Sequence, residues 1–448
     1  MLMKVSPQVN ELNRRLDDKT ATVGVCGLGY VGLPLAVAAA SAGFHVIGFD
    51  IDEAKTRALN GGASYIDGVR NADIERLRTA GRLRASSDFA ELSACDVIVV
   101  CVPTPLSSHR EPDLSFVETT ARAIADRLKP GQLIILESTT YPGTTHDVMR
   151  PILEAGGLKC GVDFLLGFSP ERQDPGNKDY DTTTTPKIVS GEGEHACQAA
   201  LSFYGSFVSR VIPVSTTQTA EAVKLAENIF RAVNIALVNE FKVLFSEMGI
   251  DVWEVIDAAK TKPFGYMPFY PGPGLGGHCI PIDPFYLTWK AREYELSTRF
   301  IELAGEINAS MPRYVVERLA VAVDQRLSTP LSQAKILVVG VSYKKNVADM
   351  RESPALKLIE LLEERLARVD FHDPHVPVLP PSRNHPKLTG RVSVSLDEAM
   401  LPAYSAVLIA TDHDAVDYAL IASHARLIVD TRNVFARNGL ASPKVVKA

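Results

Sequence analysis

Residues 21–52, ATVGVCGLGYVGLPLAVAAASAGFHVIGFDID, decide the fold of the N-terminal part of this chain. They begin with a short apolar run that is typical of a buried parallel strand. An alanine-rich segment that extends to about Ser41 is expected to be a helix, and the run HVIGF is expected to be a second strand. A strand, a helix and a strand in this order predict a βαβ unit and hence a parallel sheet.

Three glycines between the first strand and the helix have the GxGxxG spacing of a dinucleotide-binding turn. Gly27 permits a tight turn, Gly29 lets the backbone approach a pyrophosphate, and Gly32 lets the helix pack against the strand. The N-terminus of the helix then offers free N–H groups to the phosphates. Tyr30 and Val31 lie between these glycines and belong to the expected cofactor site.

Asp50 follows the second expected strand, about 20 residues beyond the glycines, where a carboxylate can accept hydrogen bonds from the adenosine ribose. A carboxylate at this position repels a 2′-phosphate, so the sequence favours NAD over NADP. Further strands are expected in 96–105 and 132–143. Thr104 and Thr140 lie near the carboxyl ends of these runs and should face the cofactor crevice.

The rest of the chain contains a helical block and a second α/β pattern. Residues 217–248 have apolar side chains at three- and four-residue steps and no proline or glycine, which predicts one long amphipathic helix. Another helical run is expected from about 298 to 327, and strands and helices alternate again after it. We expect two Rossmann-like doubly wound α/β domains joined by a central helical region, with boundaries at 1–215, 216–328 and 329–448.

Composition limits the class of protein. The chain has 448 residues, 46% of them hydrophobic and 22% charged, which is ordinary for a soluble globular protein. A net charge of −6 argues against a general nucleic-acid binder. The six scattered cysteines form no CxxC pair, so neither a metal site nor a disulfide framework is expected. The first 20 residues have no apolar core of signal-peptide length and no run approaches a membrane span, which favours a cytoplasmic protein.

The stretch PGPGLGGHCIPIDP, residues 271–284, is too rich in proline and glycine to form a helix or a central strand. It is either a stiff connection whose Cys279 is a small apolar side chain, or a loop that presents a nucleophilic thiol. The expected NAD site favours the second interpretation, because a thiolate that attacks an aldehyde lets the oxidation of an alcohol continue to the acid. Asp283, four residues on, is placed to orient water or accept a proton.

Other polar residues have the spacing that this chemistry needs. Lys224 and Asn228 are four residues apart on the long expected helix, so they share a face and can hold an oxygen that gains negative charge. A solvent-exposed Lys/Asn edge is the alternative. Glu171, in the turn GFSPERQDPG, is either a general base or a charge at a helix N-terminus. Three cations in residues 343–355 form surface ion pairs or grip a diphosphate: Lys344, Lys345 and Arg351.

Five motifs, in this order, resemble those of the UDP-glucose/GDP-mannose dehydrogenase family: GLGYVGLPLA, SPER, AEAVKLAEN, GPGLGGHCIPIDP and YKKNVADMRESPA. The resemblance covers about residues 20–435. It implies the NAD-dependent oxidation of the C6 alcohol of a nucleotide sugar to a carboxylate, in two steps, through a thiohemiacetal and a thioester. It also implies a homodimer built on the central helices and a C-terminal domain that binds the UDP part of the substrate.

The resemblance implies roles for six catalytic residues: Cys279 as the nucleophile, Lys224 and Asn228 as the oxyanion pair, Asp283 as the water-handling aspartate, Glu171 in thioester hydrolysis and Thr140 near the catalytic water. It also implies that Arg351 and Thr140 contact NAD and that Lys344 contacts the nucleotide sugar. Further substrate contacts are expected from Glu171, Lys224 and Asn228, and from a set of residues in the SPER turn and the loop before the cysteine: Arg172, Phe269, Tyr270, Gly274, Gly276 and Gly277.

The surroundings of the cysteine bear on the identity of the sugar. UDP-glucose members of the family usually have serine before the cysteine and lysine before the aspartate, where this chain has His278 and Ile282. The segment is most similar to UDP-N-acetylglucosamine 6-dehydrogenases of bacterial polysaccharide pathways, so UDP-N-acetylglucosamine is the expected substrate. UDP-N-acetylmannosamine and UDP-glucose are alternatives. A two-electron hydroxyacid dehydrogenase and a non-catalytic nucleotide-sugar sensor are more remote ones.

Overall fold

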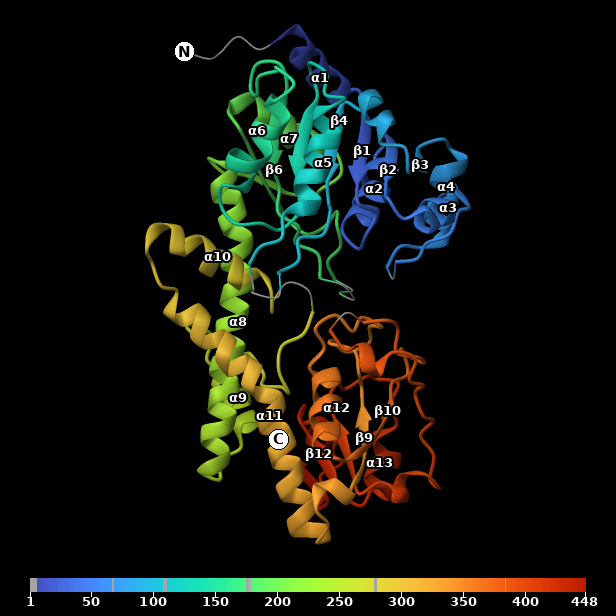
Figure 1. Cartoon of the computed structure of the whole chain (residues 1–448), viewed down its shortest axis with the longest axis vertical. Coiled ribbons are helices and arrows are strands. Elements are labelled where there is room, and N and C mark those ends of the chain that lie inside the picture. The colour runs from blue at the N-terminus through green and yellow to red at the C-terminus, as the bar shows by residue number, and fades with distance from the viewer. Residues whose placement is uncertain are drawn as a thin grey trace. The chain divides into compact units, whose positions relative to one another are not determined.

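The computed structural model describes residues 6–66, 68–107, 111–174, 177, 179–277, 280–382 and 384–448. The chain divides into two compact units (Figure 1). The first comprises residues 1–227 and 285–297, and the second comprises residues 228–284 and 298–448. Each unit contains its own sheet, which confirms the predicted α/β class with two doubly wound sheets and long central helices. The three domain boundaries given above remain predictions.

The sheet of the first unit has eight strands in the order β3-β2-β1-β4-β5-β6-β7-β8. Neighbouring strands are parallel except for β6 and β7. From β1 the chain builds β2 and β3 on one side and β4 to β6 on the other, so the topology reverses between β1 and β4, where ligands of such sheets bind. The strands are β1 Thr22–Cys26, β2 His45–Phe49, β3 Leu83–Ser86, β4 Val97–Val100, β5 Leu133–Leu136, β6 Leu165–Phe168, β7 Lys187–Gly191 and β8 Val211–Pro213.

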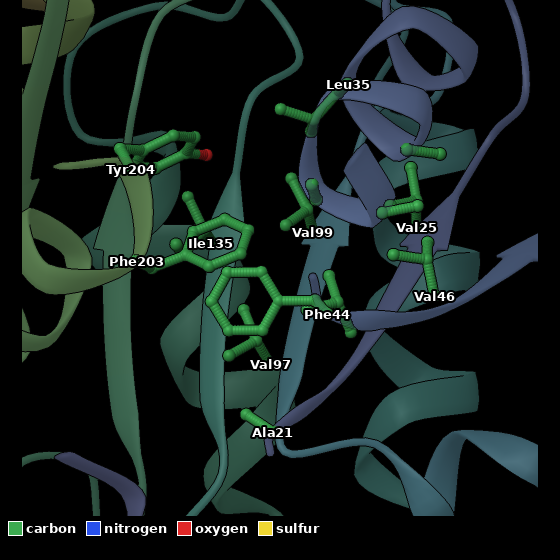
Figure 2. Packing of buried hydrophobic residues seen from close by; sticks show 14 of the residues in the cluster. Ala21, Val25, Leu35, Phe44, Val46, Val97, Val99, Ile135, Phe203 and Tyr204 are labelled. Atoms are coloured by element: carbon green, nitrogen blue, oxygen red, sulfur yellow. The ribbon is translucent and has the colours of Figure 1, made fainter. Parts of the chain in front are cut away.

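Helices cover both faces of this sheet because alternate strand residues point to opposite sides. Val97 and Val99 belong to one core cluster, which also contains Phe44 and Phe203 (Figure 2). Ile98 and Val100 face a second cluster, which contains side chains of α5. The helices are α1 Pro7–Asp17, α2 Gly32–Ser41, α3 Glu53–Asn60, α4 Asn71–Thr79, α5 Ser115–Ala125, α6 Arg150–Glu154 and α7 Glu194–Gly205.

The sheet of the second unit is parallel throughout, in the order β10-β9-β11-β12-β13, and its topology reverses between β9 and β11. Ile336 and Val338 face a core shared with α11 and α12, whereas Leu337 and Val339 face the opposite core. The elements are β9 Lys335–Val339, β10 Arg368–His372, β11 Ala406–Ile409, β12 Ile428–Asp430, β13 Val445–Lys447, α9 Val252–Ala259, α12 Pro354–Glu364, α13 Tyr418–His424 and α14 Val434–Arg437.

Two long helices run between the sheets in sequence, α8 (Thr217–Glu247) and α11 (Arg299–Leu327). Their bounds agree with the predicted helices to within a residue. The division between the units falls within α8, after Glu227, and again near the start of α10 (Asp283–Ala291). Among the helices that the structure describes, none is both long and apolar enough to cross a membrane.

Two of the predicted strand runs end sooner than expected. β4 stops at Val100 and β5 stops at Leu136, so the second halves of the runs 96–105 and 132–143 are loops. Prolines in these halves, among them Pro103 and Pro142, have no N–H to donate to a ladder. Thr104 and Thr140 therefore lie in loops beyond the carboxyl ends of β4 and β5.

Candidate active site

The glycine turn after β1 leaves room for a ligand at one position only. Gly27 has φ +93°, and a Cβ there would lie 2.6 Å from the carbonyl oxygen of Cys101. A Cβ on Gly32 would lie 1.9 Å from the carbonyl oxygen of Gly27. A Cβ on Gly29 would meet no described heavy atom within 4 Å. The protein itself therefore excludes side chains at Gly27 and Gly32, whereas the open space at Gly29 suits the approach of a pyrophosphate to the N-terminus of α2.

Asp50 is held firmly at the end of β2. One carboxylate oxygen, Oδ2, accepts hydrogen bonds from the backbone N–H of Leu28 at 2.9 Å and from Lys55 Nζ at 3.1 Å. The other accepts from the backbone N–H of Asp52 at 2.9 Å. The carboxylate is therefore oriented beside the glycine turn. Its contact with a ribose stays a prediction.

Tyr65 was not expected to take part in the cofactor site. Its hydroxyl donates to the carbonyl oxygen of Leu28 at 2.9 Å, so it fixes the glycine turn from the side of the helical segment after β2. Burial, and then the nearby charges of Asp50 and Asp52, raise the pKa of this hydroxyl well above its usual value, which keeps it a donor. Nothing in the sequence signals this role, because Tyr65 and Leu28 are 37 residues apart.

The loops after β4 and β5 are tied together at Thr104. Its Oγ1 donates to the carbonyl oxygen of Thr139 at 2.7 Å, and its own carbonyl accepts a hydrogen bond from the Tyr286 hydroxyl. Thr140, which follows Thr139, is 1% exposed, and its Oγ1 has no hydrogen-bond partner among the described residues. A buried hydroxyl without a partner is costly, so this atom is suited to a bound water or ligand.

Glu221 on α8 is a functional candidate that sequence reasoning missed. Its carboxylate accepts hydrogen bonds from the backbone N–H of Gly143 at 2.6 Å, and from the backbone N–H and the Oγ1 of Thr145 at 2.8 and 2.7 Å. These bonds hold the loop that follows Thr140. Burial is the main reason that the pKa of Glu221 rises to about 7. Its place three residues before Lys224, on the same helix face, was the available signal.

Lys224 and Glu171 form a buried ion pair in the first unit. Lys224 Nζ lies 3.2 Å from Glu171 Oε2, and the two side chains are 6% and 5% exposed. The second carboxylate oxygen of Glu171 accepts from the backbone N–H of Gln173. A buried charge needs a partner, and removal of one member leaves the other uncompensated. The helix residue expected to hold an oxyanion is thus paired with the carboxylate expected to act in hydrolysis.

Asn228 and Asp283 form a similar pair in the second unit. Asn228 Nδ2 donates to Asp283 Oδ2 at 2.6 Å, and both residues are at most 5% exposed. Asp283 is the first residue of α10. The structure therefore brings together, in two separate pairs, four of the residues that the sequence assigned to catalysis. Their catalytic roles stay predictions.

The glycines before the cysteine are packed against protein. Gly274 has φ +138°, and a Cβ on it would lie 3.1 Å from Cβ of Pro354. A Cβ on Gly276 would lie 2.6 Å from Cβ of Tyr343. Protein atoms thus exclude side chains from this stretch. The residues expected to provide and flank the thiol, His278 and Cys279, lie outside the described residues.

The other residues that were expected to contact ligands also contact protein groups. Tyr270 stacks on Trp253 with ring centroids 5.4 Å apart, and the ring of Phe269 lies 5.7 Å from that of Phe230. Among the cations, Arg172 bonds Glu227 and the carbonyl oxygen of Pro186, Arg351 pairs with Asp349, and Lys345 pairs with Asp414. Lys344 also has an interaction partner. The expected surface ion pairs are present, and contacts with ligands stay predictions.

Three sequence profiles of one family match the chain in order. They describe the NAD binding domain (residues 21–208), the central domain (218–310) and the UDP binding domain (337–437) of the UDP-glucose/GDP-mannose dehydrogenase family. Together they cover most of its length.

Individual relatives agree with this match. A UDP-N-acetyl-D-mannosamine dehydrogenase of Pyrococcus horikoshii is 36% identical over 92% of this chain and 95% of its own length. A UDP-N-acetyl-D-glucosamine 6-dehydrogenase of Pseudomonas aeruginosa is 38% identical over 80% of this chain and 84% of its own. A solved structure of the UDP-D-ManNAc dehydrogenase of Pyrococcus horikoshii has a TM-score of 0.84 and 35% identity over 95% of this chain and 97% of that one.

Substitution by alanine should have different effects at Gly32 and at Gly29. Gly32→Ala should lower the melting temperature by several degrees, because its Cβ would overlap the carbonyl oxygen of Gly27. Gly29→Ala should leave the melting temperature unchanged and weaken NAD binding about tenfold or more, because only the ligand would meet the new methyl group. Thermal unfolding and calorimetric titration with NAD measure both. Equal loss of stability in the two variants would contradict this assignment.

The raised pKa of Glu221 predicts a pH-dependent stability. The folded-state pKa, about 7, lies above the ordinary value of 4.5, so its stabilising contribution is present below pH 4.5 and is lost as the pH rises through 7. The free energy of unfolding should fall across that window by up to about 3 kcal/mol, and Glu221→Gln should remove this part of the slope. Chemical denaturation at several pH values measures it. The exposed Glu364→Gln, at the end of α12, is the control, and an unchanged slope in Glu221→Gln would refute the prediction.

Proposed function

This chain belongs to the UDP-glucose/GDP-mannose dehydrogenase family, and on that premise we propose that it oxidises the C6 hydroxyl of UDP-N-acetylglucosamine to a carboxylate. At the coarser level it is an NAD-dependent nucleotide-sugar 6-dehydrogenase that binds a UDP-sugar through its UDP-binding domain. The roles of individual residues and the identity of the sugar are the proposal.

The first oxidation converts the alcohol to an aldehyde. The C6–H bond breaks with its electron pair, and the hydroxyl proton passes to Asp283, directly or through a water. NAD supplies the hydride acceptor at both oxidations. Lys224 and Asn228, one turn apart on α8, stabilise the negative charge that develops on O6. Asn228 already donates to Asp283 at 2.6 Å, which orients that carboxylate.

The second oxidation requires the thiol. The Cys279 thiolate adds to the C6 carbonyl, and the resulting thiohemiacetal oxyanion is stabilised by the same pair on α8. Loss of the second hydride leaves a thioester. Glu171 then takes a proton from a water that attacks the acyl carbon, the carbon–sulfur bond breaks, the sugar acid is released, and the departing thiolate or solvent takes up the proton from Glu171. The hydroxyl of Thr140, which has no hydrogen-bond partner in the described part of the chain, is suited to hold that water.

One observation supports these roles most directly: each donor on α8 is buried against a carboxylate, Lys224 against Glu171 in the turn after β6 and Asn228 against Asp283 at the start of α10. In the Lys224–Glu171 pair the ammonium is available to stabilise an oxyanion and the carboxylate to activate a water. The pair as a whole is neutral until charge develops on the substrate. The open space beside Gly29 supports the NAD site in the same unit.

The proposal of UDP-N-acetylglucosamine rests on the segment around the cysteine. Its histidine at position 278 and isoleucine at 282 are similar to members that act on UDP-N-acetylhexosamines. The relatives above carry two different sugar names, N-acetylmannosamine and N-acetylglucosamine, at comparable identity. UDP-N-acetylmannosamine is therefore the second candidate, and the two substrates differ only in configuration at C2.

The sugar is tested by kcat/KM for UDP-N-acetylglucosamine, UDP-N-acetylmannosamine and UDP-glucose under identical conditions. We expect UDP-N-acetylglucosamine to be preferred by about tenfold or more, which is the range that shape alone provides. A preference for UDP-N-acetylmannosamine would reassign the sugar and keep the chemistry.

Cys279→Ser tests the covalent route. A serine hydroxyl is a much poorer nucleophile at neutral pH, so the variant should form no sugar acid while it retains NAD binding. Mass spectrometry of the products measures the acid. The control is Cys197→Ser, because that thiol lies on α7, a helix to which the proposed chemistry assigns no residue. Acid formation by Cys279→Ser at the wild-type rate would contradict the thioester route.

We also propose a homodimer that covers one face of α8, together with the three-part domain division. Four large apolar side chains on α8 or directly after it are about half exposed: Phe230, Leu237, Leu244 and Met248. The first three recur every seven residues and so form one stripe. An exposed apolar stripe of this length is typical of a protein–protein interface.

The double variant Leu237→Glu, Leu244→Glu should be a monomer, because two buried charges without partners oppose association. Light scattering coupled to gel filtration gives the mass, and Leu366→Glu, at a site exposed by 74%, is the control. A monomeric wild type, or a dimeric double variant, would count against this interface.

A further inference from the structure

Lys242 is a buried cation for which the proposed chemistry has no role. It lies on α8 and is 5% exposed. Its Nζ donates to the carbonyl oxygen of Gly272 at 3.0 Å and lies 5.4 Å from the centroid of the Tyr314 ring. Burial, and then the charge of Arg432, lower the pKa of Lys242 to about 7. A lysine kept in so unfavourable a place is costly to the fold, which calls for another reason for its presence.

The same glycine is held from its other side. The backbone N–H of Gly272 donates to Asn239 Oδ1 at 3.0 Å. The amide group of Asn239 in turn donates to Asn308 Oδ1 at 3.0 Å, and Asn308 donates to the carbonyl oxygen of Ala232 at 3.0 Å. Asn239 is fully buried. Two side chains from successive positions on one face of α8 therefore bind both polar groups of a single residue.

The residues around Gly272 leave this segment little freedom. A Cβ on Gly272 would lie 2.7 Å from Arg432 Nη1. Arg432 is itself fixed, because its Nε donates to the carbonyl oxygen of Ala410 at 2.9 Å. Five residues further on, the backbone N–H of Gly277 donates to the carbonyl oxygen of Arg351 at 2.9 Å. The segment 272–277 is thus held at both ends within the second unit, and the chain reaches the proposed nucleophile two residues later.

We propose that Lys242, together with Asn239, is a positioning residue that fixes Gly272 and thereby sets where the following loop delivers Cys279. This inference rests on the proposed function, because it concerns the placement of that thiol. Lys242 acts through the backbone of the loop and touches neither the sugar nor NAD in this account. Two groups, the Gly272 carbonyl and the Tyr314 ring, compensate only part of the cost of burying Lys242.

The two oxidations differ in their need for the thiol, which makes the effect specific. Transfer of the first hydride depends on the positions of the sugar, NAD and the pair on α8. The second oxidation and the hydrolysis proceed only after the carbon–sulfur bond has formed. A displaced loop should therefore release aldehyde after the first oxidation, whereas general unfolding would reduce both steps together.

The test is the number of NADH formed per sugar consumed by Lys242→Met, which keeps an apolar stem and removes the donor. We expect two NADH per sugar in the wild type and a value near one in the variant. Aldehyde should be trapped as a hydrazone, and the rate of acid formation should fall about tenfold to a hundredfold. The KM for the UDP-sugar should stay within about twofold, because uniform substrate binding is not altered. Lys357→Met is the matched control, because Lys357 lies on α12 with its side chain about half exposed.

Two further variants test the same segment. Lys242→Arg retains a donor and should restore most of the acid formation. Gly272→Ala, whose Cβ would press on Arg432, should release aldehyde as Lys242→Met does. Full acid formation with two NADH per sugar in both Lys242→Met and Gly272→Ala would overturn the proposal. So would a loss of both oxidations in equal measure at an unchanged melting temperature.

A measurement without turnover separates this inference from the proposed function. Iodoacetamide alkylation of Cys279, followed on its tryptic peptide, should be severalfold faster in Lys242→Met than in Lys357→Met, because a loosened loop exposes the thiol. Equal rates would refute the positioning role whatever the substrate. A wild type that forms one NADH per sugar would instead contradict the proposed four-electron chemistry, and the alkylation result would still decide the role of Lys242.

Discussion

The buried ion pair between Lys224 and Glu171 is the constraint on which the rest of the site depends. An ammonium inside a protein is tolerated only with a partner, so the position of Lys224 on α8 dictates where the turn after β6 must bring its carboxylate. The same helix face binds the loop after β5 through Glu221. One turn beyond Lys224, Asn228 binds Asp283. Helix α8 thus carries partners for the turn after β6 and the loop after β5 in the first unit and, separately, for the start of α10 in the second unit.

Glycine is required at several positions for two different physical reasons. At Gly27 and Gly32, and in the stretch before the cysteine, protein atoms occupy the space that a side chain would need. At Gly29 no described atom occupies that space, and we expect the requirement for glycine to come from the ligand. The sequence predicts that Gly274, Gly276 and Gly277, before the cysteine, contact the substrate. The structure adds that the glycines of this loop let it pack against Tyr343, Pro354 and Arg432.

Much of the fold followed from local patterns. The spacing of apolar residues predicted α8 and α11 almost to the residue, and the glycine turn with Asp50 predicted the first βαβ unit. The length of β4 was overestimated because the apolar run continues through Cys101 and Val102 to Pro103, and that of β5 because the polar residues 137–140 were counted into the strand. Local patterns depend only on a residue and its near neighbours in the sequence. They therefore predict the two long helices and the first βαβ unit well, since these elements form mainly from such local preferences.

The site was predictable in part. Lys224 and Asn228 have a helical spacing, and the motifs named Glu171 and Asp283 as their neighbours in function. The contacts of Tyr65, Glu221 and Lys242 could not be predicted, because their partners lie 37, 78 and 30 residues away in the sequence and bind through backbone groups that carry no sequence signal. Such partners become visible only in the folded chain.

The most direct measurement is the mass of intact Glu171→Gln protein after incubation with NAD and UDP-N-acetylglucosamine. If Glu171 activates the water that cleaves a thioester on Cys279, both oxidations proceed in this variant and hydrolysis stops. The account predicts a burst of two NADH per subunit and a covalent adduct on the peptide that contains Cys279. Steady turnover to the sugar acid without an adduct would contradict it.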